Sequence, residues 1–237
     1  MSSQNKNNQV LENNTGNQLF PVFLKLNQLK VLLVGAGNIG LEKLEAVLTN
    51  SPNTEINIVA ESFLPKLLQL AGNYSRVKLH SKRFEAADLE GHDLVIIATG
   101  DNILNAEIRS LARQRHLLIN VADKPDLCDF YLGSIVKKGD LKIGISTNGK
   151  SPTVAKRLKE IFQTNLPDEL DITLQQMNKL RNTLGGDFAH KVKELNKATA
   201  SLVNNSNEKP YVREISWKLL AAVFAGLSLI VIMFKYY

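Results

Sequence analysis

The sequence predicts an α/β fold: a Rossmann-like, doubly wound parallel sheet, then a small β region and a helical region, with a C-terminal transmembrane helix. Three observations lead to this prediction of the sheet. Apolar strand candidates alternate with helical patterns, as in sheets built from βαβ units. A glycine-rich turn, Gly35-x-Gly37-x-x-Gly40, directly follows the first strand candidate. The run LVIIA at 94–98 is apolar throughout, which is typical of a parallel strand buried on both faces.

The glycine turn predicts a dinucleotide site. It stands between the apolar run at 31–34 and a helical pattern that opens at Leu41. Gly35 would allow the tight turn, Gly37 would let a pyrophosphate approach the backbone, and Gly40 would let the helix pack close to the strand. Free N–H groups at the start of the helix would bind the phosphates. The alternative is a turn that uses glycine only for its geometry.

The remaining elements of the sheet domain are expected in order along the chain. They are a helix at 41–50, a strand at 55–60, a helix at 62–70, strands at 77–79 and 94–98, a helix at 105–115 and a strand at 117–121. Arg109, Arg113 and Arg115 are expected on the solvated face of their helix. Ligands of such sheets bind beyond the carboxyl ends of the strands, so the loops at 35–40, 98–102 and 122–126 should converge on the site.

The β region and the helical region follow the sheet domain. Residues 131–136 and 141–145 are expected to pair as a hairpin with a Gly-Asp turn. A helix is expected at 153–164, and residues 168–203 are expected to be helical with a break at Gly185-Gly186.

The two ends of the chain differ in composition. Residues 1–18 are rich in Asn, Gln and Ser and contain no apolar segment of a signal peptide, which predicts a disordered tail. Leu219 to Phe234 is an apolar run of 16 residues. It reaches the about 20 residues of a membrane span only if it is counted from Ser216 to Lys235.

We therefore predict a membrane anchor at 215–237, behind a polar linker at 204–214. Trp217 and Tyr236 stand where interfacial aromatic residues belong, and lysines and arginines precede the span. The catalytic part is expected in the cytoplasm, anchored by this single-pass helix. A buried C-terminal helix or an oligomer contact is the alternative.

Composition narrows the class of ligand. The net charge is +6, with 44% hydrophobic and 22% charged residues, which suits a globular protein that binds acidic small molecules or a membrane surface. Nucleic acid is not expected, because the chain has no zinc-finger or aromatic-basic signature. Cys128 is the single cysteine, so no internal disulfide is possible. His80, His92, His116 and His190 are scattered, and no metal site is predicted.

Acidic residues that could bind the cofactor or act in catalysis follow two of the expected strands. Glu61, followed by Ser62, stands after the second strand, where many NAD proteins hold the ribose hydroxyls with an acidic residue. No arginine stands near Glu61 in the sequence, which favours NAD over NADP. Asp123 directly follows the fifth strand and could act as a general base or orient a substrate. The alternative for Asp123 is a turn residue before Lys124-Pro125.

The loop at 146–152 could bind an anion. It offers N–H and hydroxyl donors, and Lys150, Lys156 and Arg157 add positive charge. As the alternative, Ser151 and Pro152 are explained by a capped helix start alone.

Five segments in this order resemble one family: LFPVFLKL, VLLVGAGNIGLEK, LVIIATGD, INVADKPDLCDF and ISTNGKSPTVAKRLKE. They are similar to the N-terminal dehydrogenase half of siroheme synthase and to the stand-alone precorrin-2 dehydrogenases, over about residues 19–167. Family members oxidise precorrin-2 to sirohydrochlorin with NAD, and some also insert ferrous iron to give siroheme. The resemblance implies an NAD-binding domain at 19–127, a dimerisation region at 128–152, a helical region at 153–203 and a homodimer. It does not cover the anchor.

The resemblance also implies roles for residues. The family's essential aspartate matches Asp123, which we predict to be catalytic. The predicted cofactor-binding residues are Gly35, Gly37, Asn38, Ile39, Gly40, Glu61, Ser62 and Thr99. The predicted substrate-binding residues are Ser146, Thr147, Gly149, Lys150 and Ser151. Asn148 stands where the family usually has glycine.

The predicted function is therefore NAD-dependent oxidation of precorrin-2, with ferrous iron insertion as a second activity to be tested. The substrate is a tetrapyrrole with many carboxylates, which a basic cleft would attract. A non-catalytic, membrane-tethered NAD-sensing module is the alternative, although such regulators lack the NVAD and NGKSP segments. An unrelated NAD reductase, in which Asp123 is only a cap, is a third interpretation.

Overall fold

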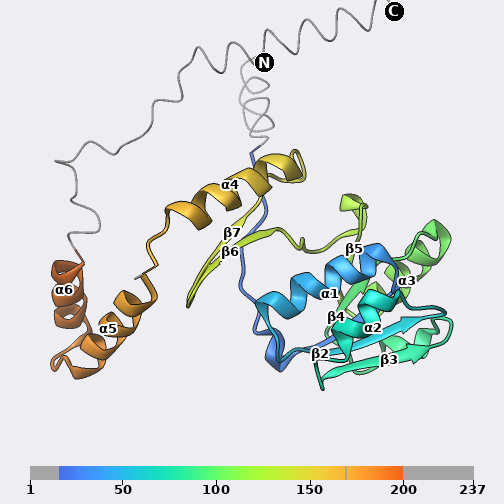
Figure 1. The fold of residues 1–237 in the computed structure, drawn as a ribbon, viewed down its shortest axis with the longest axis horizontal. Helices are drawn as coiled ribbons and strands as arrows, with labels where there is room; N and C mark the ends of the chain where they lie inside the picture. Colours follow the sequence, from blue (N-terminus) through green and yellow to red (C-terminus); the bar gives the residue numbers. More distant parts are fainter. Residues whose placement is uncertain (1–15, 169, 200–237) are drawn as a thin grey trace, which may run out of the picture. The chain divides into compact units, whose positions relative to one another are not determined.

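The computed structural model describes residues 16–168 and 170–199 (Figure 1). The chain separates into two compact units, the first ending at Asp171 and the second beginning at Ile172. The predicted linker at 204–214 and almost all of the predicted tail at 1–18 lie outside the described residues.

A five-stranded parallel sheet forms the centre of the first unit. Its strands are β1 (Lys30–Val34), β2 (Glu55–Ala60), β3 (Val77–Ser81), β4 (Leu94–Ile97) and β5 (Leu118–Val121), in the order β3-β2-β1-β4-β5. Val34 at the end of β1 lies opposite Val59 of β2 and Ile97 of β4, so the carboxyl ends of these strands are level. The order reverses between β1 and β4, which makes their ends the expected ligand site. The predicted doubly wound sheet is confirmed.

Alternate residues of β1 enter two separate cores, because successive side chains of a strand point to opposite faces. Val31 and Leu33 pack with α1 (Asn38–Asn50) and α2 (Pro65–Ala71). Leu32 and Val34 pack with α3 (Asn102–Gln114) and with residues of the 3₁₀ turn η2 (Ala86–Leu89). All four residues of β4 are buried, as its apolar run predicts.

Helix starts differ from the expected ones where capping residues decide them. α2 begins at Pro65 rather than Ser62, because proline fits the first helical position and disfavours helix in the residue before it. α3 begins at Asn102 rather than Asn105, because the Asp101 carboxylate accepts from the N–H groups of Ile103 and Leu104.

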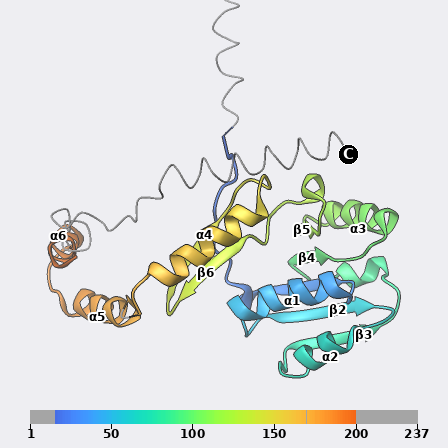
Figure 2. The same ribbon diagram turned by 45° about the horizontal axis from the view of Figure 1, so that its top comes forward.

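A second, two-stranded sheet follows in the same unit. The antiparallel strands β6 (Ser134–Lys138) and β7 (Leu141–Ile145) are joined by the expected Gly139-Asp140 turn. Helix α4 (Pro152–Asn165) lies along β6 (Figure 2). Its N-cap is Ser151, whose hydroxyl accepts from the Val154 N–H.

Two helices lie at the end of the described chain. α5 (Leu170–Thr183) runs into the second unit, and α6 (Phe188–Ala198) follows it. They are separated at the expected glycine pair, where Gly186 has a φ of 90°. Asp187 caps α6 by accepting from the His190 N–H.

The predicted C-terminal transmembrane helix is wrong, and this corrects both the predicted fold class and the predicted membrane localisation. Over the residues that the structure describes, no helix has both the length and the apolar composition needed to cross a membrane. The segment at 215–237 itself lies outside the described residues. Its uninterrupted apolar run has 16 residues, short of the about 20 of a span. We therefore withdraw the transmembrane helix and the membrane anchor.

Candidate functional site

The glycine turn between β1 and α1 depends on two of its glycines for packing. Gly35 has a φ of 100°, and a Cβ there would lie 2.5 Å from the Ala98 carbonyl oxygen. A Cβ at Gly40 would collide with the carbonyl oxygen of Gly35. Gly37 is different, since a Cβ there would meet no heavy atom within 4 Å. The backbone at Gly37 is therefore open to a ligand.

The start of α1 fits the phosphates of a dinucleotide. Its N-cap is Gly37, and no side chain caps the helix. The first helical hydrogen bond runs from the Leu41 N–H to the Gly37 carbonyl at 2.9 Å. The N–H groups of the first three helical residues, Asn38 to Gly40, have no partner within the helix, as at any helix start. These donors and the helix dipole favour an anion.

The loop after β4 is held by a buried amide that sequence analysis missed. The Thr99 hydroxyl donates to Asn105 Oδ1, and Asn105 Nδ2 donates to the Thr99 carbonyl at 3.2 Å. Asn105 is buried on α3, and the Thr99 backbone that it holds lies beside Gly35. The sequence did hold a signal for it. Asn105 stands three positions before Ile108, so it is a polar residue on the inward face of an amphipathic helix.

Glu61 and Ser62 follow β2 at the carboxyl edge of the sheet and are exposed. Glu61 Oε1 lies 3.0 Å from Nε of Arg83. The expectation that no arginine lies near Glu61 is therefore wrong. Arg83 comes from the segment after β3, the parallel neighbour of β2, so its proximity depends on strand pairing and not on the local sequence.

Asp123 follows β5 in a turn with a φ of 57°, a left-handed conformation that aspartate tolerates better than most residues. Cys128 holds this turn, because its sulfur accepts from the Val121 N–H at 3.2 Å and lies 3.3 Å from the Lys124 carbonyl. Burial raises the pKa of the Cys128 thiol, so it is protonated at neutral pH. The Asp123 carboxylate has no hydrogen-bond or ion-pair partner within the part of the chain that the structure describes.

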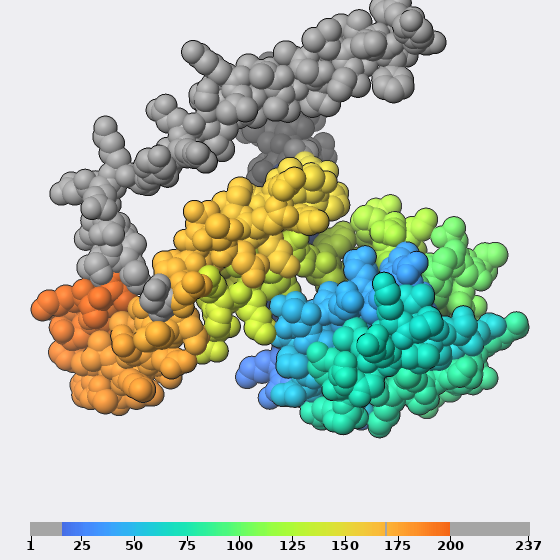
Figure 3. Space-filling model, in the orientation of Figure 1, coloured from blue at the N-terminus to red at the C-terminus, as the bar shows by residue number. Residues whose placement is uncertain are grey.

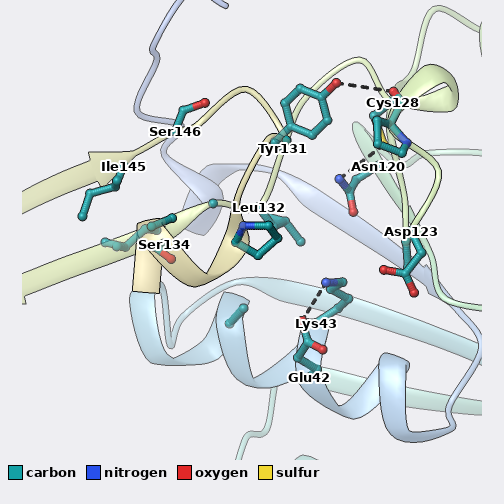
Figure 4. A pocket seen from close by; sticks show the side chains of 18 of the residues that line it. Glu42, Lys43, Asn120, Asp123, Cys128, Tyr131, Leu132, Ser134, Ile145 and Ser146 are labelled. Atoms are coloured by element: carbon teal, nitrogen blue, oxygen red, sulfur yellow. Dashed lines mark hydrogen bonds and ion pairs between the residues drawn. The ribbon is translucent and has the colours of Figure 1, made fainter. Parts of the chain in front are cut away.

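Asp123 lines a cavity of about 650 Å³ in the first unit. One wall is a face of α1, and the others are the end of β5, the β6 and β7 strands and the first turns of α4 (Figures 3 and 4). The cavity brings Asp123 together with three predicted substrate residues, Ser146, Thr147 and Gly149.

Other predicted site residues lie elsewhere. Lys150 and Ser151 do not line the cavity, and neither do the predicted cofactor residues Gly35, Gly37, Asn38, Ile39, Gly40, Glu61, Ser62 and Thr99. The glycine turn and the residues after β2 and β4 instead form the carboxyl edge of the sheet. The Ser151 hydroxyl serves as the cap of α4, which is the alternative considered for it.

The basic residues of the cavity differ from the expected ones. Lys43, Lys124 and Lys159 line it, whereas Lys156 and Arg157 do not.

Lys43 is largely enclosed. Its side chain is only 16% exposed, and Nζ lies 2.7 Å from Oε1 of Glu42, whose side chain is 69% exposed. Figure 4 shows Lys43 and Asp123 turned into the same cavity. Lys43 belongs to a stripe with Ala46 and Asn50, spaced three and four residues apart, which could have been found in the sequence.

Two family models match segments of this chain. The family model described as "Putative NAD(P)-binding" matches residues 22–134, and the one described as "Sirohaem biosynthesis protein central" matches residues 138–164. The siroheme synthase of Methylococcus capsulatus is 36% identical over 147 residues, 62% of this chain and 30% of that protein. The siroheme synthase of Pseudoalteromonas atlantica is 32% identical over 171 residues, 72% of this chain and 36% of that protein.

The chain thus spans about a third of the length of these curated relatives. Among solved structures, "SirC, precorrin-2 dehydrogenase" matches with a TM-score of 0.60 and 22% identity, over 76% of this chain and 88% of that one. At this identity the match concerns the fold. Together with the two family models, the similarities show that the chain belongs to the siroheme synthase family, of which it carries the NAD(P)-binding and central segments.

Proposed function

We propose that the chain is a precorrin-2 dehydrogenase, which oxidises precorrin-2 to sirohydrochlorin with NAD. The observation that carries the proposal is the Asp123 carboxylate, which lines a cavity between the nucleotide-binding sheet and the β6–β7–α4 part of the same unit. Family membership adds the reaction class. NAD, when bound, accepts the hydride that leaves the tetrapyrrole.

Residues of this chain bind the cofactor, accept the proton and attract the substrate. The backbone at Gly37 and the start of α1 hold the pyrophosphate, and Glu61 accepts from a ribose hydroxyl. Asp123 takes the proton that the substrate loses as its hydride leaves, so the substrate gives up two hydrogens, one as hydride to NAD and one as a proton to the carboxylate. Lys43 and Lys124 attract the carboxylates of the tetrapyrrole.

The substrate loop supplies polar groups at the far wall of the cavity. The Thr147 hydroxyl accepts from the Ser151 N–H at 3.3 Å, and Ser146 Oγ accepts from the Asn148 N–H at 3.2 Å. These bonds fix a tight turn in which Asn148 has a φ of 54°. Asparagine tolerates this conformation, so it can replace the glycine that the family usually has here.

The experiment follows NADH formation and sirohydrochlorin absorbance with the purified chain, precorrin-2 and NAD. Asp123→Asn should reduce the turnover about 10²–10⁴-fold, the usual contribution of a general base, while NAD binding is kept. Asp126→Asn is the matched control, because Asp126 is exposed in the same loop and does not line the cavity. Binding of NAD without any turnover would favour the NAD-sensing module instead.

Ferrous iron, as a second substrate, is tested in the same variants by siroheme formation from sirohydrochlorin. Asp123 is the acceptor we propose for the pyrrole protons that the metal displaces. Among the described residues, no group of three or more His, Cys, Asp and Glu side chains is arranged to hold a metal ion. Loss of both activities in Asp123→Asn would support one shared base.

We also propose that the chain forms a homodimer. β6 and β7 form a two-stranded sheet, so within the described chain each strand has one edge without a neighbouring strand, to which another strand could be added. Phe20, Val22 and Phe23 are exposed by 87%, 60% and 71% in the segment before β1, an apolar surface that a second copy could cover. Light scattering after size exclusion should give twice the chain mass, and Phe23→Glu should shift it toward the monomer.

A further inference from the structure

The carboxyl edge of β2 carries an acidic residue and an arginine that face each other. Ala60 at the end of β2 lies opposite Ser81 at the end of β3, and the Lys82 N–H donates to the Ala60 carbonyl at 3.1 Å. The residues just beyond the two strand ends therefore meet at one edge. Glu61 Oε1 and Arg83 Nε lie 3.0 Å apart there.

The ion pair between these residues is free to open. The side chains of Arg83 and Glu61 are 83% and 64% exposed, and such solvated pairs contribute little to stability. Within the described part of the chain, Arg83 forms no ion pair or hydrogen bond with any residue other than Glu61, so its two Nη groups are available. The neighbouring cation, Lys82, is already paired with Glu85 at 3.0 Å and Asp88 at 2.8 Å.

The two side chains suit two forms of the same cofactor. A carboxylate after the second strand accepts from the ribose 2′-hydroxyl of NAD, and an arginine at this place accommodates the 2′-phosphate of NADP. A guanidinium binds phosphate through two parallel hydrogen bonds. A site with the acid alone would repel that phosphate.

We infer that Arg83 makes this site accept NADP as well as NAD, an inference that rests on the proposed function. With NAD, Glu61 holds the ribose and Arg83 stays paired with it. With NADP, Arg83 turns its free Nη groups to the phosphate and compensates the negative charge of Glu61. Arg83 is thus the residue that sets nucleotide preference.

The test measures NADH and NADPH binding by nicotinamide fluorescence, with the full chain and no tetrapyrrole. The wild-type chain should bind the two nucleotides with dissociation constants within about tenfold of each other. Arg83→Gln should weaken NADPH by about tenfold to a hundredfold, the contribution of hydrogen bonds to a charged group, and change NADH by less than about threefold. Glu61→Gln should weaken NADH more than NADPH.

Arg76→Gln is the matched control. Arg76 precedes β3 at the opposite edge of the sheet, where it donates to the Asn53 carbonyl at 3.2 Å, and its loss should affect neither nucleotide. NADPH binding more than about a hundredfold weaker than NADH in the wild type, or an equal effect of Arg83→Gln on both, would overturn the inference alone. Binding of neither nucleotide would overturn the proposed function and the inference together.

Discussion

Arg109 and Asp129 form a two-bond ion pair that ties α3 to the segment leaving the parallel sheet. Nη1 lies 2.6 Å from Oδ2, and Nη2 lies 2.8 Å from Oδ1. Asp129 also accepts from the Ile119 N–H of β5 at 3.2 Å. The same carboxylate therefore fixes both ends of the loop that contains Asp123. Arg109 is only 12% exposed, so the expectation that it lies on a solvated face is wrong.

This pair predicts a pH dependence of stability. The hydrogen bond from Arg109 holds the pKa of the Asp129 carboxyl below its ordinary value. A depressed pKa in the folded state means that the contribution is present above the ordinary carboxyl pKa of about 4 and is lost as the pH falls through the lower folded value. Asp129→Asn should therefore lower the unfolding free energy at pH 7 by about 1–3 kcal/mol.

The measurement is urea unfolding of both proteins at several pH values. The difference between wild type and Asp129→Asn should begin to shrink below about pH 4, where the Asp129 carboxyl of the unfolded chain binds a proton. It should reach its minimum at lower pH, once the folded carboxyl is protonated as well. Asp126→Asn, in the same segment, should leave the unfolding midpoint unchanged. A difference that stays constant down to acid pH would show that the carboxylate charge is not what stabilises the loop.

Lys43 should act on substrate binding and not on the chemical step. Its ammonium is enclosed by the cavity, and its neighbour Glu42 is exposed and easily turned away. We expect Lys43→Met to raise KM for precorrin-2 about tenfold, the contribution of one charge-assisted hydrogen bond, with kcat nearly unchanged.

Steady-state kinetics against precorrin-2 check this prediction, and NADH binding by fluorescence serves as the internal control. Lys66→Met is the matched surface variant, because Lys66 is exposed on α2 and does not line the cavity. A fall in kcat at constant KM would instead assign Lys43 to the transition state.

Alanine substitutions at Gly37 and Gly40 should have different effects, the first on NAD affinity and the second on folding stability. Gly37→Ala places a methyl group in open space with an ordinary backbone, so the protein should fold normally and lose NAD affinity. Gly40→Ala drives the methyl group into the Gly35 carbonyl, which cannot move cheaply. Overpacking of this kind costs about 1–3 kcal/mol, and the better helix propensity of alanine offsets at most about 1 kcal/mol.

Thermal unfolding and NADH titration of the two variants check the pair. A stable Gly40→Ala protein would mean that α1 shifts to make room, and unchanged NADH affinity in Gly37→Ala would mean that no phosphate approaches this backbone. The contrast between the variants matters more than either magnitude.

How much of the fold could be predicted depends on the range of the interactions. The buried strand at 94–97 and the turn at Gly35 carry their signals in neighbouring residues, so the parallel sheet was predicted correctly. Arg109 and Asp129 are 20 residues apart, and Glu61 and Arg83 follow two adjacent parallel strands. Neither pair can be predicted before the strand order is known.

The site shows the same limit. Asp123 was singled out from the sequence because it follows a strand, and the carboxyl ends of parallel strands are where ligands bind. The lysines of the cavity were not found, because which face of α1 meets the β6–β7 strands depends on tertiary packing. The predicted basic residues Lys150, Lys156 and Arg157 do not line the cavity. Its three lysines stand beside three acidic residues, Glu42, Glu45 and Asp123, so the lining is balanced in charge rather than basic.

Asn105 predicts a further effect on the cofactor edge. Its buried side chain makes two hydrogen bonds with Thr99, and Asn105→Ala would remove both, leaving the Thr99 hydroxyl only its bonds with the Asp101 backbone. The loss of these two hydrogen bonds should cost about 1–3 kcal/mol. Because the loop beside Gly35 then loses its support, NADH affinity should fall together with thermal stability. Asn102→Ala, at the exposed start of the same helix, should change neither, and a stable variant with normal affinity would show that water replaces the amide.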